Sequence, residues 1–238
     1  VANKDGKTAL QLALTNDHKA VVQLLGNIAD SEDNSAVAMA AQKGEIDLLK
    51  KLIASKAAVN SHNAQGLTPL MLASRNGHTD AVEALVAARA NPRARDNEGL
   101  SAIALAARHN HPEVLRVLVA ARASLNDPNN QAQTPLMLAV SAGHTDMIRL
   151  LIDARADVDA CDADGFTALM LAALAGRVEI VKILIDANAW LDVQNRSGET
   201  ALIAAAAGGH TDVVNVLLAA GADATIDNKD GATALDVA

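Results

Sequence analysis

The stretch Asp162–Gln194, DADGFTALMLAALAGRVEIVKILIDANAWLDVQ, is 33 residues long, and most of the chain repeats its pattern. It opens on a turn signal, DADG, which precedes Thr167 and a run of Ala and Leu residues. Gly176 interrupts that run, and a second, more apolar run follows from Ile180 to Ile185. A fixed period between about 20 and 50 residues is the sequence signature of a solenoid built from stacked repeats.

The Thr or Ser that opens each first helix fixes the phase of the repeats. Successive members are 33 residues apart except for the first interval, which is 27: Thr8, Ser35, Thr68, Ser101, Thr134, Thr167, Thr200 and Thr233. We therefore expect a single domain over residues 1–238, with repeats near 3–29, 30–62, 63–95, 96–128, 129–161, 162–194, 195–227 and a partial repeat at 228–238. The short first interval predicts a shortened turn around Gly26–Asp30.

Local signals inside each repeat predict a turn followed by two helices. Asp or Asn opens the turn and Gly follows three residues later, a combination that suits a tight turn with positive φ. The Thr or Ser is then a natural helix N-cap. Pro69 and Pro135 come directly after it, at a position where a missing N–H costs nothing. In the third repeat we expect helices near Thr68–Asn76 and His78–Ala88.

Composition limits the class of protein. Half of the residues are hydrophobic, aromatic residues make up 1%, and Ala, Leu, Val and Ile supply the apolar side chains, which favours short, closely packed helices over strands. The single cysteine, Cys161, cannot form an internal disulfide. No apolar run approaches the roughly 18 residues of a membrane span, and no secretory signal is visible. These features predict a cytoplasmic protein without membrane insertion.

The repeat pattern D-x-x-G-x-T-P-L-x-x-A, followed by G-H, a V-V-x-L-L run and G-A-D, resembles the ankyrin repeat over essentially the whole chain. The resemblance implies an all-α solenoid, a curved stack of about seven or eight helix pairs with short β-hairpin turns that project as fingers. It also implies that the fingers and the first helices form a concave face. The family's general role is protein–protein recognition through that face.

Two slots depart from the family pattern. The family usually places His three residues after the Thr, and this chain has other residues there: Gln11, Ala38, Met71, Ala104, Met137, Met170, Ile203 and Asp236. We expect the three Met side chains to fill the core, because Met adapts to irregular gaps. The Gly that usually ends the second helix is kept at Gly221 and replaced elsewhere by Lys56, Arg89, Arg122, Arg155 and Asn188.

The residues that replace this Gly allow two interpretations. A cation near a helix C-terminus is favourable, so the replacements can be sequence drift at tolerated positions. Alternatively, Lys56, Arg89, Arg122 and Arg155 form a basic ladder that faces an acidic partner or phosphate. In either case, a left-handed backbone at a non-Gly residue carries a strain of about 1 kcal/mol.

Catalytic and metal chemistry are not expected. Five histidines, His18, His78, His111, His144 and His210, occupy one slot at the start of the second helix. Equivalent atoms in successive repeats lie about 10 Å apart, whereas ligands of one zinc ion lie about 2 Å from it. We therefore assign these histidines to hydrogen bonds within loops. No phosphate-binding or nucleophile motif is present, and we expect no enzyme activity, cofactor or metal.

The candidate protein-binding residues are those on the turns and first-helix ends that the repeat does not require. They are Leu67, Arg75, Arg95, Leu100, Arg108, His109, Phe166 and Leu174. The arginines would supply charge complementarity, and Leu67, Leu100 and Phe166 would be apolar anchors. The alternative for the apolar residues is packing between fingers. Trp190 is either an interface aromatic or a cover for a helix end.

The main functional hypothesis is a scaffold that binds a protein or peptide through the concave face. Residues 129–238 carry 6 Lys/Arg and 15 Asp/Glu, which argues against nucleic acid as the partner. We expect a monomer. The alternative is a structural or regulatory arm of a larger protein, such as an effector, channel or enzyme. It is motivated by a chain that begins within a turn motif and ends within a helical pattern.

Overall fold

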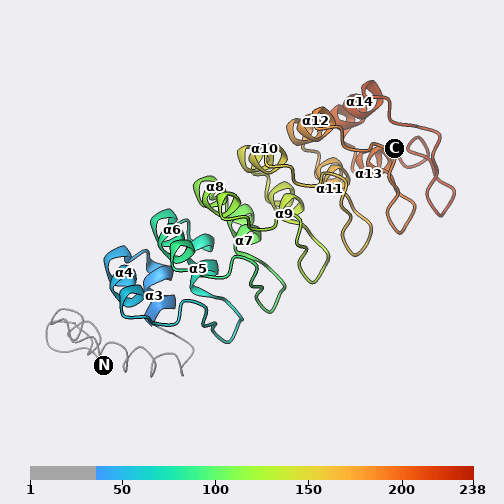
Figure 1. Ribbon diagram of the computed structural model, residues 1–238. Helices are drawn as coiled ribbons and strands as arrows, with labels where there is room; N and C mark the ends of the chain where they lie inside the picture. The colour runs from blue at the N-terminus through green and yellow to red at the C-terminus, as the bar shows by residue number, and fades with distance from the viewer. Residues whose placement is uncertain (1–35) are drawn as a thin grey trace, which may run out of the picture. The chain divides into compact units, whose positions relative to one another are not determined.

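The computed structural model describes residues 36–238, and this part of the chain consists of helices, turns and loops without a β-strand. Expectations that concern Thr8, Ser35, His18, the first repeat or the shortened turn at 26–30 lie outside the described residues. The structure divides into two compact units, Val1–Ser124 and Leu125–Ala238, hereafter unit 1 and unit 2. Each unit is a stack of helix pairs with projecting loops (Figure 1).

The described part of unit 1 forms three helix pairs. They are α3 (Ala36–Lys43) with α4 (Ile46–Ala54), α5 (Pro69–Arg75) with α6 (Thr79–Ala87), and α7 (Ala102–Arg108) with α8 (Pro112–Ala120). The first helices α3, α5 and α7 pack against one another in one row, and α4, α6 and α8 pack in a second row. This arrangement confirms the predicted helix pair of each repeat and its 33-residue spacing.

Unit 2 has the same construction. Its pairs are α9 (Pro135–Ala142) with α10 (Thr145–Asp153), α11 (Ala168–Leu174) with α12 (Val178–Asp186), and α13 (Ala201–Ala207) with α14 (Thr211–Ala219). Again the first helices form one row and the second helices another. The fold is therefore the expected all-α repeat solenoid.

The first helices are the most buried elements of each unit. In α7 every residue from Ala102 to Ala107 is buried, whereas α8 buries one face through Val114, Leu115 and Leu118. Small Ala side chains allow neighbouring first helices to approach closely, and each buried Leu or Val stabilises the stack by about 1.5–3 kcal/mol. Met71, Met137 and Met170 are each 1% exposed, which confirms their prediction as core residues.

The first helices α5, α7, α9, α11 and α13 each begin after the predicted Thr or Ser cap. The side-chain oxygen of Thr167 accepts a hydrogen bond from the Met170 amide at 3.2 Å, and Ser101 accepts one from Ala104 at 3.3 Å. Such a bond satisfies one of the free N–H groups at a helix start and contributes about 1 kcal/mol. At Thr68 the Met71 sulfur also accepts from the Thr68 amide, at 3.4 Å. Met71 therefore both fills the core and accepts a hydrogen bond from the N-cap residue of its own helix.

The projecting loops, here called fingers, are five-residue turns closed by their first side chain. The fingers are residues 63–67, 96–100, 129–133, 162–166, 195–199 and 228–232. Asp162 Oδ1 accepts hydrogen bonds from the amides of Asp164 and Phe166, both at 2.9 Å. Within each unit, consecutive fingers are joined by one backbone bond, such as Arg196 N to Asp164 O at 2.9 Å in unit 2. Isolated antiparallel bridges, Cys161 to Thr167 and Asp227 to Thr233, replace full β-strands here.

The slot that usually ends the second helix with Gly keeps a left-handed backbone. The φ angles are 62° at Lys56, 63° at Arg89, 58° at Arg122, 72° at Arg155 and 62° at Asn188. The turn geometry is therefore retained although the side chain has changed. Each non-Gly residue accepts a backbone strain of about 1 kcal/mol at this position.

Candidate protein-binding surface

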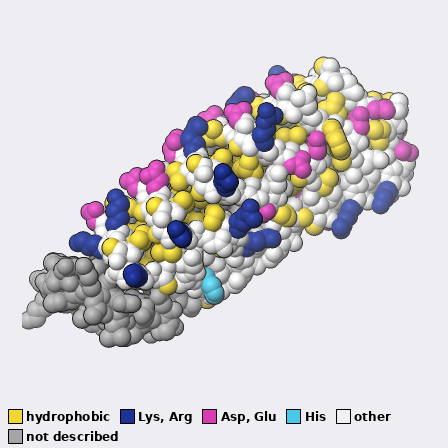
Figure 2. Space-filling view, in the orientation of Figure 1, with side chains coloured by type: hydrophobic (Ala, Val, Ile, Leu, Met, Phe, Trp, Pro, Cys, Tyr) yellow, Lys and Arg dark blue, Asp and Glu magenta, His cyan; other side chains and the backbone are white. Residues whose placement is uncertain are grey.

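The C-terminal ends of the first helices present the side chains that vary most between repeats. In unit 1 these positions hold Arg75 and Arg108, both half-buried, and the exposed His109. Figure 2 shows Lys and Arg side chains over the helices of unit 1, interspersed with hydrophobic side chains. The surface of this unit is thus rich in cations at positions that the helix stack does not use.

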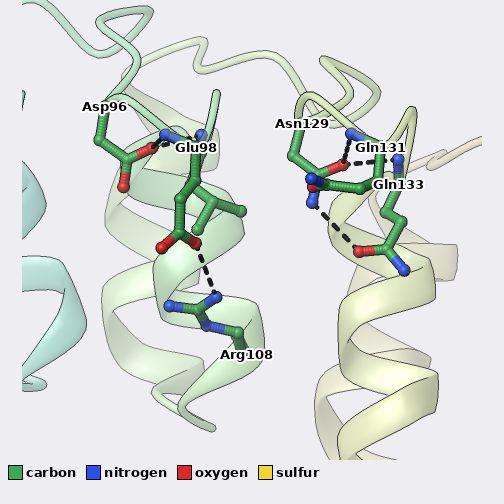
Figure 3. Close-up of polar contacts among 7 residues, drawn as sticks. Asp96, Glu98, Arg108, Asn129, Gln131 and Gln133 are labelled. Atoms are coloured by element: carbon green, nitrogen blue, oxygen red, sulfur yellow. Dashed lines mark hydrogen bonds and ion pairs between the residues drawn. The ribbon is translucent and has the colours of Figure 1, made fainter.

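Arg108 is tied to the finger above its own helix. Its guanidinium lies 3.5 Å from the carboxylate of Glu98, with side chains 38% and 69% exposed (Figure 3). An exposed ion pair of this kind contributes at most about 1 kcal/mol. A partner carboxylate could therefore replace Glu98 at little cost, so the pair positions Arg108 without removing it from the surface.

Arg95 braces its own finger. It is exposed, and its Nε donates to the Gly99 carbonyl at 2.9 Å. Gln194 does the same in unit 2, where Nε2 donates to the Gly198 carbonyl at 2.7 Å and to the Asp227 carbonyl at 2.9 Å. The charge of Arg95 remains at the surface, but part of its side chain has a structural role that the sequence did not predict.

Leu67 and Leu100 are corrections to the predicted surface. They are 6% and 1% exposed, so the prediction that they are exposed anchors is wrong, and the alternative that they pack between fingers stays a prediction. The cause is the finger turn. The Asn63 side chain accepts from the Leu67 amide at 2.9 Å, and the Asp96 side chain accepts from the Leu100 amide at 2.8 Å. In both fingers the last residue of the closed turn is thus held in a buried position.

Phe166 and Leu174 lie at opposite ends of α11 in unit 2. Phe166, in the same finger slot as Leu67 and Leu100, is half-buried, whereas Leu174 is 48% exposed. The positions equivalent to Leu174 in the neighbouring repeats are Ser141 and Ala207, which are small and exposed. Leu174 therefore stands as a single large apolar side chain among small ones. In unit 1 the same slot holds Arg75 and Arg108.

The histidines at the second-helix start bind the preceding repeat, as predicted. Nε2 of His78, His111 and His210 lies 3.0, 2.9 and 3.0 Å from the carbonyl oxygens of Gln42, Arg75 and Leu174, which are exposed at the end of a first helix. Their ring nitrogens are committed to this role. The described residues contain no group of three metal-ligating side chains.

Arg177 takes the place of histidine in the sixth repeat, and sequence reasoning missed its role. Its guanidinium donates to the carbonyl oxygens of Val140 at 2.6 Å and Ser141 at 3.0 Å. These are the free carbonyls at the end of α9, the same kind of acceptor that the histidines use. The signal was available, because Arg177 occupies the histidine slot of the repeat. Arg177 is consequently a structural cation and is unsuited to bind a partner.

Negatively charged side chains surround Cys161, which lies directly before the finger 162–166 in unit 2. The thiol is exposed. Partial burial raises its pKa above the ordinary value, and the carboxylates of Asp162, Asp157 and Asp159 raise it further. In the same unit, hydrogen bonds from Thr225 lower the pKa of Asp223, and hydrogen bonds from Thr233 lower that of Asp236. The carboxylates around Cys161 therefore produce a negative local field at this thiol.

An apolar groove of about 480 Å³ lies in unit 2 between α13, α14 and the last turn. Its lining includes Leu202, Val214, Leu218 and Leu235, with little polar surface. Catalytic sites combine an apolar pocket with a few convergent polar groups. The groove lacks that combination and is not a candidate active site. No helix in the described part of the chain is long and apolar enough to cross a membrane.

Comparison with known proteins identifies the repeat. A family model described as "Ankyrin repeats (3 copies)" matches residues 37–129 and 121–195, and one described as "Ankyrin repeats (many copies)" matches residues 189–238. No curated protein matches the chain. Among solved structures, the ankyrin repeat domain of Bcl-3, described as a unique member of the IkappaB protein family, is similar with a TM-score of 0.82 at 29% identity. The match covers 87% of this chain and 95% of that one. The chain belongs to the ankyrin-repeat family.

Proposed function

We propose that this chain is a protein-interaction module whose first-helix ends and fingers bind a protein or peptide segment. Ankyrin repeats are typically interaction domains and not enzymes, which supports the coarse assignment. One observation supports the assignment of binding to the first-helix ends and fingers. The slot of Arg75, Arg108 and Leu174 is kept accessible in both units, yet its residues change from cationic to apolar, whereas the buried slot before it is apolar except at Ser74.

Each unit offers a distinct kind of contact at its own first-helix ends and fingers. Unit 1 presents Arg75, Arg95, Arg108 and His109, which suit acidic or polar groups of a partner. Unit 2 presents Leu174, with Phe166 half-buried at the other end of the same helix. The ends of a seven-residue helix are about 10 Å apart, so these two side chains could contact neighbouring positions of one peptide segment.

A peptide-display selection tests the proposal and does not require an identified partner. Random peptides on phage would be selected against the immobilised chain, and synthetic versions would then be titrated by interferometry. We expect selected peptides to lose at least about tenfold in affinity, or about 1.4 kcal/mol, with either Arg75→Ala plus Arg108→Ala or Leu174→Glu. Both changes affect accessible side chains, and an unchanged thermal melt would verify that the variants are folded.

Matched controls lie on the outer helices, away from the proposed face. Arg116→Ala and Lys182→Ala remove a cation from α8 and α12, and both side chains are exposed. Peptides that bind the two outer-helix variants normally and the face variants poorly would support the assignment. Peptides that bind every variant with the affinity of the original chain would overturn it.

A further inference from the structure

The loops that follow the second helices differ sharply in charge between the two units. These connecting loops are residues 54–61 and 87–94 in unit 1, 120–127 where the sequence passes from one unit to the other, and 153–160, 186–193 and 219–226 in unit 2. The two unit 1 loops carry three cations and no carboxylate, Lys56, Arg89 and Arg93, and loop 120–127 carries one of each, Arg122 and Asp127. The unit 2 loops carry six carboxylates and one cation: Asp153, Asp157, Asp159, Asp186, Asp192, Asp223 and Arg155.

The fold does not require these carboxylates. Asp159 Oδ1 accepts from the Trp190 amide at 2.8 Å, and one repeat earlier Asn126 Oδ1 accepts from Asp157 at 3.0 Å. In unit 1, Asn60 Oδ1 accepts from Asn91 at 2.7 Å in the same way. Asn side chains therefore make the bond that joins consecutive connecting loops. The negative charge of Asp159 is therefore not needed for this hydrogen bond.

Two further carboxylates occupy unfavourable positions. Asp153 and Asp186 are the last residues of α10 and α12, and both are exposed. The C-terminal end of a helix carries partial negative charge, so a carboxylate is disfavoured there. The equivalent residue at the end of α6 in unit 1 is Ala87. Residues that break a local rule without a structural gain are expected at functional surfaces.

Trp190 lies in the middle of the acidic loops. It is the single tryptophan of the chain and is 68% exposed, so it does not cover a helix end. Its amide is held by Asp159, and the residue two positions later, Asp192, holds the Asp223 amide at 2.9 Å. Asp157 and Asp223 occupy the position of Trp190 in the preceding and following loops, about 10 Å away on either side.

We propose that Trp190 and the carboxylates of the unit 2 connecting loops form a second docking surface, which binds a Lys- and Arg-rich peptide segment of a partner protein. The indole face attracts cations, and Trp is the most effective aromatic residue for this contact. The surrounding carboxylates complement further positive charges and accelerate encounter with a basic segment. The surface does not include Arg75, Arg108, Phe166 or Leu174, so it is separate from the face described above.

Fluorescence of Trp190 provides a direct test, because the chain contains no Tyr and no other Trp. Unlabelled hexa-arginine and hexaglutamate peptides would be titrated against the chain at low and moderate salt. We expect hexa-arginine to change the Trp190 emission saturably, with weaker binding at higher salt. Hexaglutamate should have no effect. Equal responses to both peptides, or no response to hexa-arginine, would overturn the proposal.

A charge variant with native-like geometry separates this site from bulk attraction. Asp157→Asn, Asp159→Asn and Asp192→Asn together keep every side-chain acceptor and remove three charges. We expect this triple variant to bind fluorescein-labelled hexa-arginine at least about tenfold more weakly, measured by polarisation. The control removes three charges elsewhere in unit 2, through Asp146→Asn, Glu179→Gln and Asp212→Asn. A control that weakens binding as strongly as the triple variant would contradict a local surface.

Two more measurements complete the test. Trp190→Ser should also weaken binding of the labelled peptide, by at least about threefold, whereas Leu174→Glu should leave it unchanged. Loss of binding in the Leu174 variant would assign the peptide to the other face and overturn this proposal. Sedimentation of the chain alone identifies a different occupant. Salt-sensitive self-association that the triple Asn variant abolishes would show that the surface binds the cationic loops of a second copy.

Discussion

The two units repeat the same interior and differ in their connecting loops. Their first helices bury the same slots, as at Met71 in unit 1 and Met170 in unit 2, and both use Thr or Ser caps and histidine bonds between repeats. The connecting loops, by contrast, are purely cationic in unit 1 and mostly acidic in unit 2. Stacking therefore constrains the buried slots and leaves the loops free to acquire different charges.

The same contrast is visible in the total charge of the two units. Residues 36–124 contain 11 Lys/Arg and 7 Asp/Glu, a net charge of +4, whereas residues 125–238 contain 6 and 16, a net charge of −10. Helix stability does not demand such a division, because each charge lies on an exposed or half-exposed side chain. The comparison predicts equal effects for changes at shared slots and unequal effects for changes in the connecting loops.

The largest effect is expected at the glycines that end the first helices. Gly77 and Gly176 have φ of 75° and 66°, and an added Cβ would lie 2.5 and 2.6 Å from Nδ1 of His111 and His210. These rings are held by hydrogen bonds and cannot move freely. Backbone strain and overpacking together should make Gly77→Ala and Gly176→Ala each destabilising by about 2–4 kcal/mol. Urea denaturation followed by circular dichroism would measure the loss.

Gly209 is the control for the glycine comparison. Its φ is 67°, but no atom lies within 4 Å of an added Cβ. Gly209→Ala should therefore cost only the backbone strain, about 1 kcal/mol. A cost for Gly209→Ala as large as that for the other two would show that the histidine contact is unimportant. Clearly different costs at Gly77 and Gly176 would break the equivalence of the two interiors.

Ser74 is an exception to the shared interior, and its replacement should improve stability. The residue is fully buried in α5, its hydroxyl has no hydrogen-bond partner among the described residues, and Ala41 and Ala107 hold the same slot in the neighbouring repeats. A buried, unsatisfied hydroxyl is unfavourable by roughly 1–3 kcal/mol. Ser74→Ala should raise the free energy of unfolding by about 1 kcal/mol. Ser101→Ala, which removes a helix cap, should lower it by a similar amount.

The interior could be predicted from sequence because its signals are local and repeated. A Thr at a helix start, an Asp that closes its own turn and a Pro at the first helical position each act within about five residues. The 33-residue spacing then locates the same turn, cap and helices in every repeat. The left-handed backbone of Arg89 and Arg155 is a finding of the structure, because the sequence showed only that these residues replace the usual Gly.

The surface was harder to predict because exposure depends on neighbours distant in sequence. Leu67, Leu100 and Phe166 share one slot, yet the two leucines are buried and Phe166 is half-buried. The Arg177 guanidinium is occupied by hydrogen bonds to carbonyl oxygens 36 and 37 residues earlier in the sequence. The acidic connecting loops were visible in the sequence, but only when equivalent slots of different repeats are compared with each other. Net charge summed over each half of the chain shows that the second half is acidic but not which loops carry the charge.

In the connecting loops we expect smaller changes in stability, and we expect them to differ between Arg89→Gly in unit 1 and Arg155→Gly in unit 2. Replacement of Arg89 or Arg155 by Gly relieves the strain of a positive φ, which favours folding by about 1 kcal/mol. Arg89 lies in a loop series that contains other cations, whereas Arg155 lies among carboxylates. Arg89→Gly should therefore stabilise the chain by a few tenths of a kcal/mol more than Arg155→Gly at low salt. Equal gains at low salt, or a difference that persists at high salt, would contradict the contrast in charge.

The finest test of the acidic loops uses Cys161 as a probe of the local field. Partial burial raises the pKa of this thiol above its ordinary value, and the carboxylates of Asp162, Asp157 and Asp159 raise it further. Asp157→Asn plus Asp159→Asn removes two negative charges and keeps both acceptors, so the pKa should fall. Because only the thiolate reacts, the variant should be alkylated by iodoacetamide faster than the original chain at any pH below the thiol pKa. The pH profile of the alkylation rate should move to lower pH by an amount that decreases with added salt.

Asp146→Asn, in the first turn of α10, is the control and should leave the profile in place. An unchanged profile in the double variant would mean that the carboxylates do not act on the thiol, and the negative field attributed to these loops would have to be abandoned.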